Sequence, residues 1–337
     1  MARSRPTVVL AMAPALTKDL FADAHHARLA ALADVPDPAP LARFDDARAD
    51  ALLPRAEILL TGWGSPRIDP ALLDRASALR AVVHAAGTVK GHVDPACFAR
   101  GLRVSSAAAA NAVPVAEFTL AAILLAGKRA FRLQRRYREL RSFRLWSQEV
   151  PAIGNHRKVV GIVGASRIGR LVLAHLRGFD FERLVYDPFL GAADAAALGA
   201  ERVELDALLR RSDIVSLHAP SLPETRHMLD ARRLALLRDG AVLVNTARGA
   251  LVDGDALTAA LVSRRIDAVI DTTDPEILPA DSPHYDLPNV FLTPHIAGAM
   301  GSETQRMATL ALDEIERLTK GEPLQHEVRV EDWDRIA

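Results

Sequence analysis

The sequence predicts an α/β protein built on parallel sheets that helices cover. Apolar, strand-like runs alternate with helical stretches rich in Ala, Leu and Arg along almost the whole chain, which is typical of βαβ units. The length of 337 residues favours about two domains. A glycine-rich turn between a strand and a helix begins only near residue 159, so a separate α/β unit is expected before it.

The first third of the chain carries the strands of this earlier unit. Each is a short apolar run bounded by Pro, Gly or charged residues. A long helical segment follows, which we divide into residues 115–127 and 128–144. The predicted strands are 8–12, 58–61, 79–85 and 102–105.

A second set of strands and helices follows the glycine-rich turn. An amphipathic helix over about 300–319 ends near Lys320 and Gly321, and we expect it to cross back and complete the first unit. The predicted domains are therefore 1–108 with 299–337, and 109–298. The strands expected in the second domain are 159–163, 184–186, 213–217, 241–245, 268–270 and 290–293.

Composition and charge exclude several classes of protein. Lys plus Arg and Asp plus Glu both number 42, so the basic excess of a nucleic-acid or membrane-surface binder is missing. Cys97 is the single cysteine, which rules out an internal disulfide and a cysteine zinc cluster. We expect no metal site, no membrane helix and a cytoplasmic location. The apolar run 8–13 resembles a signal peptide, but we interpret it as a buried strand.

The glycine-rich turn indicates a site for a dinucleotide. Residues 159–170 run from a strand through a tight turn into a helix, with Gly164, Ser166 and Gly169 at the positions of a G-x-G-x-x-G fingerprint. Ser166 replaces the middle glycine, and its hydroxyl is a possible phosphate donor. Arg167, at the start of the helix, adds positive charge where pyrophosphate would bind. A plain strand–helix turn is the alternative interpretation.

Asp187 lies at the position expected of an acid that binds ribose. It ends the next predicted strand, 23 residues after Gly164, close to the usual offset of about 20. A carboxylate there accepts bonds from a ribose 2′-hydroxyl and repels a 2′-phosphate, which favours NAD over NADP. The alternative is that Asp187 only forms a turn before Pro188.

Three later strands each deliver a reactive side chain. Arg248 follows one strand, Asp271 and Glu276 follow the next, and His295 follows the third. The carboxyl ends of strands line the ligand crevice of an open α/β sheet. An Arg binds a carboxylate in a fork, a His exchanges protons near neutral pH, and a Glu orients the imidazole. The joint spacing therefore indicates acid–base chemistry on a small anion.

Five segments together resemble the D-isomer-specific 2-hydroxyacid dehydrogenase family, over residues 50 to 320. The resemblance implies two Rossmann-like domains, a flavodoxin-like substrate domain and an NAD(H)-binding domain, with the active site in the cleft between them. It also implies a homodimer formed through the cofactor domains and residues 128–150. The segments are N-A-V-P-V-A-E at 111–117, the glycine turn, L-H-A-P at 217–220 with Thr225, N-T-A-R-G-A-L-V-D at 245–253, and L-T-P-H-I-A-G at 292–298.

The resemblance assigns roles to individual residues. Arg248 would grip the carboxylate and carbonyl oxygen of a 2-keto acid, His295 would protonate that oxygen, and Glu276 would pair with the imidazole. Asp271 would hold the nicotinamide carboxamide. The full set expected at the cofactor is Gly164, Ser166, Arg167, Ile168, Gly169, Asp187, His218, Ala219, Pro220, Thr225, Thr246, Ala247, Arg248, Asp271, His295 and Gly298.

The expected substrate loop departs from the family pattern G-V-G-x-D. Here it is Gly87-Thr88-Val89-Lys90-Gly91, so that Val89 replaces a glycine and is expected to tighten the site. Lys90 brings a charge, either as a solvent-facing side chain or as a contact to a second carboxylate or phosphate. The expected substrate contacts are Thr88, Val89, Lys90, Asn111 and Arg248.

Other functions stay open at this stage. One alternative is a catalytically idle dimeric scaffold that senses NAD, although a scaffold has no need to keep Arg248, Glu276 and His295 together. Another is a dehydrogenase of formate or phosphite, for which Lys90 is the residue to test. The basic stretch 128–144 carries interspersed aromatic residues, so we expect it to face a protein partner rather than nucleic acid.

Overall fold

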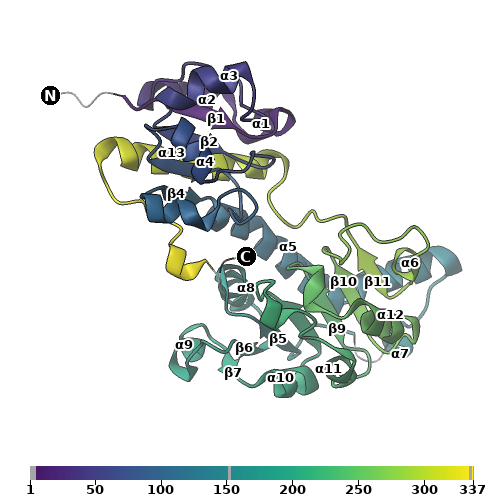
Figure 1. Ribbon diagram of the computed structural model, residues 1–337. Coiled ribbons are helices and arrows are strands. Elements are labelled where there is room, and N and C mark those ends of the chain that lie inside the picture. Colours follow the sequence, from purple (N-terminus) through teal and green to yellow (C-terminus); the bar gives the residue numbers. More distant parts are fainter. Residues whose placement is uncertain (1–4, 151–152, 334–335, 337) are drawn as a thin grey trace. The chain divides into compact units, whose positions relative to one another are not determined.

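The computed structural model describes residues 5–150, 153–333 and 336, and these form two compact units. Unit 1 contains the chain up to Asn111 and again from Ala299, and unit 2 is Ala112–Gly298. The second division falls where the sequence predicts it, and the first falls three residues later than expected. Figure 1 labels the elements of both units.

Unit 1 is built on a parallel sheet in the order β1-β2-β3-β4. All three strand pairs are parallel, so the strands end at one common edge of the sheet. The strands are β1 (Val8–Ala11), β2 (Ile58–Thr61), β3 (Ala81–His84) and β4 (Arg103–Ser106), and the α-helices are α1 (Pro14–Leu20), α2 (Asp23–Leu32), α3 (Ala47–Leu52), α4 (Pro70–Arg75) and α13 (Thr304–Lys320).

The segment 34–41 lies beside β1 as an interrupted strand. Isolated parallel bridges join Thr7 to Asp34 and Ala11 to Leu41, on the edge of β1 that faces away from β2. Proline has no amide hydrogen to donate to a ladder, and residues 36, 38 and 40 are all proline. Counted with this segment, unit 1 has the strand order 2-1-3-4-5 of a flavodoxin-like sheet.

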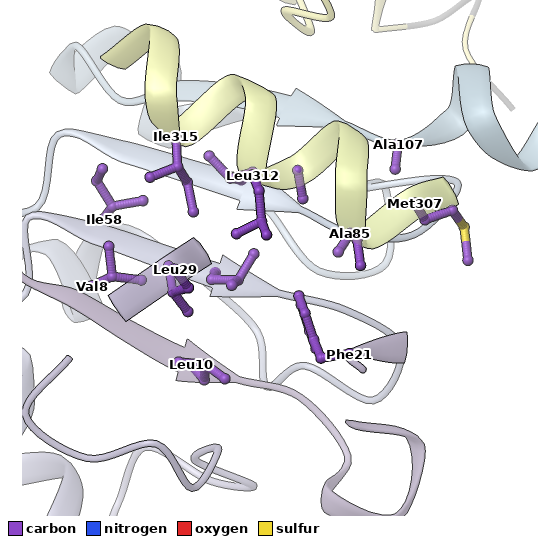
Figure 2. Packing of buried hydrophobic residues seen from close by; sticks show 14 of the residues in the cluster. Val8, Leu10, Phe21, Leu29, Ile58, Ala85, Ala107, Met307, Leu312 and Ile315 are labelled. Carbon is purple, nitrogen blue, oxygen red and sulfur yellow. The ribbon is translucent and has the colours of Figure 1, made fainter. Parts of the chain in front are cut away.

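Alternate residues of the unit 1 strands enter two apolar cores. Val8 and Leu10 of β1 contribute to the core that Figure 2 shows, whereas Val9 contributes to the core on the other face. The first core contains Leu312 and Ile315 from α13, which packs beside α2. The C-terminal helix therefore completes the first unit, as its amphipathic pattern predicts.

Unit 2 is built on a seven-stranded parallel sheet in the order β11-β10-β9-β8-β5-β6-β7. The chain runs outward from β5 to β7 and then returns to β8 on the other side, so the topological switch point lies between β5 and β8. Ligands bind beyond the carboxyl ends of the strands at such a point. The strands are β5 (Val159–Val163), β6 (Glu182–Tyr186), β7 (Glu201–Arg202), β8 (Ile214–Leu217), β9 (Val242–Asn245), β10 (Asp267–Ile270) and β11 (Val290–Leu292).

Helices cover both faces of this sheet. Helices α5 and α8 share one core with it, and α10, α11 and α12 share the other. The helices are α5 (Ala108–Gly127), α6 (Ala130–Leu140), α7 (Trp146–Glu149), α8 (Arg167–Leu176), α9 (Ala192–Ala197), α10 (Leu205–Arg211), α11 (Ala231–Ala235) and α12 (Gly254–Val262).

The long helical segment starts and ends at different places than the sequence predicts, whereas its division after residue 127 is where the sequence places it. Helix α5 begins at 108 rather than 115, and α6 ends at 140 rather than 144. Arg129 separates them in a left-handed conformation with φ 53°, and its guanidinium forms a buried ion pair with Asp267 at 3.0 Å. This long-range contact stabilises the division between the two helices.

Helix α5 is long and apolar enough, by length and composition, to cross a membrane. Its buried residues include Ala116, Ile123 and Ala126, which pack in the core of unit 2. The helix therefore has the packing of a core helix. Core helices can also be long and apolar enough to meet this criterion.

Candidate active site

Two glycines of the 164–169 turn are required by close backbone contacts. Gly164 adopts φ +99°, and a Cβ on it would lie 2.6 Å from the amide nitrogen of Ala219. A Cβ on Gly169 would lie 2.1 Å from the carbonyl oxygen of Gly164. The turn after β5 is thus pressed against the segment after β8, at the switch point of the sheet.

The middle position of the fingerprint caps the following helix. The Ser166 hydroxyl oxygen accepts a hydrogen bond from the Gly169 amide at 3.4 Å, so it serves as the N-cap of α8. The backbone amides of Ser166, Arg167 and Ile168 have no acceptor within the described residues. These free donors and the positive end of the α8 dipole form a cradle suited to pyrophosphate.

Asp187 directly follows β6 and supports the same turn. One of its carboxylate oxygens accepts from the Ala165 amide at 2.8 Å, and the other accepts from the Phe189 amide at 2.9 Å. Each oxygen keeps a lone pair for a further donor. The carboxylate therefore stands at the rim of the cradle, and the Asp187–Phe189 bond also shows the turn-forming role that the sequence left as an alternative.

The L-H-A-P segment forms the opposite wall of the cradle. His218 is buried, its Nε2 lies 2.9 Å from the Ser216 hydroxyl, and burial lowers its pKa to about 3. The ring is therefore neutral, and its Nδ1 has no partner within the described residues. Thr225 holds the loop beyond Pro220 closed, because its hydroxyl donates to the Pro220 carbonyl at 2.6 Å.

Asp271 is buried and organises the loop that carries His295. Its Oδ1 accepts from the Thr293 hydroxyl at 2.6 Å and from the Ile296 amide at 2.8 Å. Its Oδ2 accepts from the Ala297 amide at 2.9 Å. The Asp271 carbonyl also accepts from the His295 amide. This network holds His295 at φ 56°, a left-handed conformation that non-glycine residues rarely adopt.

His295 and Glu276 form a direct pair at the carboxyl edge of the sheet. The His295 Nδ1 lies 2.6 Å from the Glu276 Oε1, and both side chains are about half exposed. A carboxylate at Nδ1 leaves Nε2 as the ring atom that meets solvent or a ligand. The pair that the family resemblance implies is thus present.

Arg248 is positioned by its neighbours in the loop after β9. The Asn245 side chain donates to the Arg248 carbonyl at 2.9 Å and accepts from the Ala247 amide at 3.1 Å. A Cβ on Gly249 would lie 2.1 Å from the carbonyl carbon of Thr273. Only glycine allows this approach, which brings the Arg248 loop against the loop that carries Glu276.

In unit 1, residues 87–91 follow β3 at the carboxyl edge of the sheet. Val89 is 1% exposed and lies in an apolar core, so it anchors the loop. The expectation that Val89 tightens the site is therefore wrong, because its side chain turns inward. Asn111 lies beside this loop: its Oδ1 accepts from the Ala299 amide, and its Nδ2 is 3.5 Å from where a Gly87 Cβ would stand.

Several residues that shape the site were missed by the sequence analysis. Some residues that were expected at the cofactor are buried against neighbours within the protein. Thr293, Asn245 and Gly249 lie next to predicted residues, and their adjacency was the available signal. The Thr246 hydroxyl, expected at the cofactor, is buried and lies 2.8 Å from the Thr119 hydroxyl. Ala247 is likewise buried beside it, and Gly298 ends unit 2.

The sequence profile that matches residues 120–297 is that of the D-isomer specific 2-hydroxyacid dehydrogenase, NAD binding domain. The chain belongs to the D-isomer specific 2-hydroxyacid dehydrogenase family. The match covers β5 to β11 and so includes the glycine turn, Arg248, Glu276 and His295.

Relatives of this dehydrogenase family carry several names. The chain is 33% identical over 286 residues to D-3-phosphoglycerate dehydrogenase of Mycobacterium leprae, which covers 83% of this chain and 52% of that protein. It is 34% identical to (S)-sulfolactate dehydrogenase of Chromohalobacter salexigens, covering 78% of this chain and 87% of the relative. The chain thus spans about half the length of the phosphoglycerate dehydrogenases it matches.

A solved structure of the family shows a similar fold. Apo D-mandelate dehydrogenase of Rhodotorula graminis superposes with a TM-score of 0.81 at 25% identity, over 96% of this chain and 98% of that one. The cradle of unit 2 fits the NAD(H) of the family, since two glycines at contact distance and three free amides leave room and donors for a pyrophosphate.

Proposed function

We propose that this chain is an NAD(H)-dependent oxidoreductase that interconverts a small 2-keto acid and its D-2-hydroxy acid. The observation that carries the proposal is the His295–Glu276 pair at 2.6 Å. It lies at the same sheet edge as Arg248 and the dinucleotide cradle, where ligands of parallel sheets bind. The names of the relatives support the substrate class, because phosphoglycerate, sulfolactate and mandelate are all 2-hydroxy acids.

The side chains of unit 2 supply what the reduction of a keto group requires. Bound NADH supplies the hydride that adds to C2 of the keto acid. Arg248 binds the C1 carboxylate and the C2 oxygen, which orients the carbonyl and stabilises negative charge on that oxygen. His295 donates the proton to the same oxygen from Nε2, so one hydride and one proton convert the ketone to an alcohol. Glu276 holds the imidazole in position through its Nδ1.

Asp187 favours NAD over NADP in this proposal. Its carboxylate stands at the rim of the cradle, where it accepts from a ribose hydroxyl and repels a 2′-phosphate. Residues 188 and 189 are Pro and Phe, so no arginine follows Asp187 directly to offset that repulsion. Arg167 is exposed at the first position of α8, where its charge supports the pyrophosphate.

We further propose a homodimer that buries the surface around α6. Three large apolar side chains there are exposed: Tyr137 by 57%, Phe143 by 84% and Leu145 by 56%. Such a cluster indicates a protein interface. Light scattering should give a dimer mass for the wild type and a monomer mass for Phe143→Glu, whereas Val262→Glu, another exposed site of unit 2, should stay dimeric. A monomeric wild type would contradict this assembly.

The activity is tested by following nicotinamide absorbance with NADH and a panel of 2-keto acids. The wild type should oxidise NADH with at least one acid of the panel. His295→Ala should lower kcat by about a thousandfold while still binding NADH, since general acid catalysis contributes about 10²–10⁴-fold. Tight NADH binding without turnover of any acid would contradict the proposal and favour an idle scaffold.

A further inference from the structure

We propose that Thr273 is a positioning residue, whose hydroxyl holds the Glu276 backbone so that the Glu276 carboxylate meets the Nδ1 of His295. The inference rests on the proposed function, in which this pair orients the proton donor. It concerns unit 2 alone, and it is carried by the contacts of residues 271–278, the loop that follows β10. The effect of the threonine on the reaction is indirect and passes through Glu276.

The loop after β10 lacks the backbone hydrogen bonds that usually fix a turn. Within the described residues, no backbone–backbone hydrogen bond is formed by residues 272–278. Residue 275 is proline and has no amide hydrogen, so it cannot close a turn as a donor. The conformation of the loop therefore depends on side-chain contacts, and a carboxylate carried by the loop would be poorly fixed without them.

The Thr273 hydroxyl supplies such a contact directly at Glu276. Its Oγ1 donates to the Glu276 carbonyl oxygen at 2.8 Å, three residues along the chain. The threonine side chain is β-branched and turns about a single stiff bond. The hydroxyl is thus a fixed point relative to the Thr273 backbone, and the Glu276 backbone is tied to that point.

The Thr273 backbone is itself fixed by the turn after β9. A Cβ on Gly249 would overlap the Thr273 carbonyl carbon and the Asp274 amide nitrogen, so the two loops are in close contact there. The preceding residue, Thr272, is 2% exposed and so is anchored in the interior. Arg226 also pairs with Asp274 at 3.2 Å, but both side chains are exposed and such a pair adds little. Two close contacts therefore hold the backbone of the threonine in place.

The same segment also positions the other member of the pair. Asp271, two residues before Thr273, accepts hydrogen bonds from the amides of residues 296–297, which follow His295. One side chain of the segment 271–273 thus holds the histidine loop, and another holds the glutamate loop. Because both anchors lie on three consecutive residues at the end of β10, the approach of the carboxylate to Nδ1 is set within one rigid segment.

The pair needs such an anchor because packing does not hold it. The side chains of Glu276 and His295 are 58% and 44% exposed, and an exposed ion pair fixes its own geometry weakly. A glutamate side chain has several rotatable bonds, so a free backbone would let the carboxylate leave Nδ1. The Thr273 hydroxyl acts on the Glu276 backbone and removes part of this freedom.

The test changes the Thr273 hydroxyl and follows the tautomer of His295 by ¹⁵N nuclear magnetic resonance of the ligand-free protein. At about pH 9, well above the ordinary pKa of histidine, a carboxylate at Nδ1 keeps the ring proton on that atom. We expect the Nδ1–H tautomer in the wild type and in Thr273→Ser, which keeps the hydroxyl. Thr273→Val has the same shape without the hydroxyl, and its Nε2–H population should rise about three- to tenfold, the equivalent of one neutral hydrogen bond. His295→Ala assigns the signal.

Kinetics with NADH and the best keto acid give the second readout. Thr273→Val should lower kcat about three- to tenfold and leave KM within about twofold, because Arg248, which binds the substrate carboxylate in the proposed reaction, is unchanged. Thr273→Ser should restore kcat.

Ser263→Ala is the matched control. The Ser263 hydroxyl also donates to a carbonyl three residues away, that of Ala260 at 2.9 Å, at the exposed end of α12. Its loss removes the same kind of bond from unit 2 without touching the loop after β10. It should leave the tautomer of His295 and kcat unchanged.

The outcomes separate this inference from the proposed function. A wild-type tautomer in Thr273→Val overturns the positioning role, whatever happens to kcat or to thermal stability, and leaves the proposed function standing. If no keto acid is turned over, the proposed function fails, but the resonance experiment still decides because it needs no substrate. Thr273→Ala is the second variant should Thr273→Val not fold, and the same two results support or overturn the role.

Discussion

The carboxyl edges of the two sheets are built in different ways. In unit 2 the loops are held by polar bonds to a buried carboxylate, because Asp271 accepts three hydrogen bonds from residues 293–297. In unit 1 the loop 87–91 is held by an apolar anchor, Val89, and by backbone bonds. Unit 2 thus fixes the direction of loop side chains such as His295, and unit 1 fixes the path of the loop backbone.

The difference shows two ways of holding a loop at the edge of a sheet. Proton transfer needs a defined geometry, and a buried carboxylate that binds several backbone amides supplies it. Departures from the family pattern occur in both units, at Val89 and Lys90 in unit 1 and at Ser166 in unit 2, whereas Arg248, Glu276 and His295 match it.

The largest effect is expected from removing the carboxylate clamp of unit 2. Arg248→Ala should lower kcat/KM for the best keto acid by about a thousandfold, with both a higher KM and a lower kcat, because two charged hydrogen bonds are lost. Steady-state kinetics measure this. Arg226→Ala, an exposed arginine paired with Asp274, is the control and should change kcat/KM by less than about threefold. Similar losses in both variants would remove Arg248 from its assigned role.

A second test breaks the contact between the two functional loops of unit 2. A Cβ at position 249 would lie only 2.1 Å from the Thr273 carbonyl carbon. The valine side chain of Gly249→Val therefore forces the loop that carries Glu276 to shift. We expect a loss of about 3 kcal/mol in the free energy of unfolding and a lower kcat. Chemical denaturation and kinetics measure both.

Gly254→Ala is the matched control, since an added Cβ there meets its nearest neighbour only at 3.9 Å. It should leave stability and kcat close to the wild type. Wild-type stability in Gly249→Val would show that the two loops do not depend on the close approach.

A third prediction compares one buried histidine in each unit. His84 and His218 both have their pKa lowered from 6.5 to about 3 by burial. Between pH 3 and pH 6.5 the unfolded chain binds more protons than the folded chain. The free energy of unfolding therefore has its full value above pH 6.5 and decreases as the pH is lowered below it. Each histidine should cost about 2 kcal/mol of unfolding free energy at pH 5.

Denaturation at pH 7 and pH 5 measures this loss. His84→Gln should reduce the pH dependence for unit 1 and His218→Gln for unit 2, whatever their effects at pH 7. Wild-type pH dependence in both variants would argue against neutral histidines in the fold.

The smallest effect is expected at the rim of the cradle. Asp187→Ala should reduce the preference for NADH over NADPH by about tenfold, since one charge-assisted bond and one repulsion are removed. Dissociation constants for both nucleotides, measured by fluorescence, provide the test. Asp187→Asn keeps an acceptor for the Ala165 amide and separates loss of charge from loss of the turn. An unaltered preference would place the ribose contact elsewhere.

The sequence by itself determined the class of fold and the residues at the sheet edge of unit 2. Alternating apolar runs and helices require βαβ units, and the ends of parallel strands meet at one edge, so Arg248, Glu276 and His295 were predictable as a group. The family resemblance also implied the Glu276–His295 pair, which the structure brings to 2.6 Å. The amphipathic helix near residue 304 was predictable for the same reason, since its apolar stripe needs a core.

Tertiary structure decided which partner each polar side chain takes. The Asp271 carboxylate accepts hydrogen bonds from residues 293–297, which the sequence did not indicate. The Val89 side chain turned inward, and the Arg129 guanidinium paired with Asp267. Periodicity encodes which positions are buried, but hydrogen-bond partners distant in sequence are chosen by the packing of whole elements. The direction of a loop side chain is chosen in the same way, so only the folded chain reveals either.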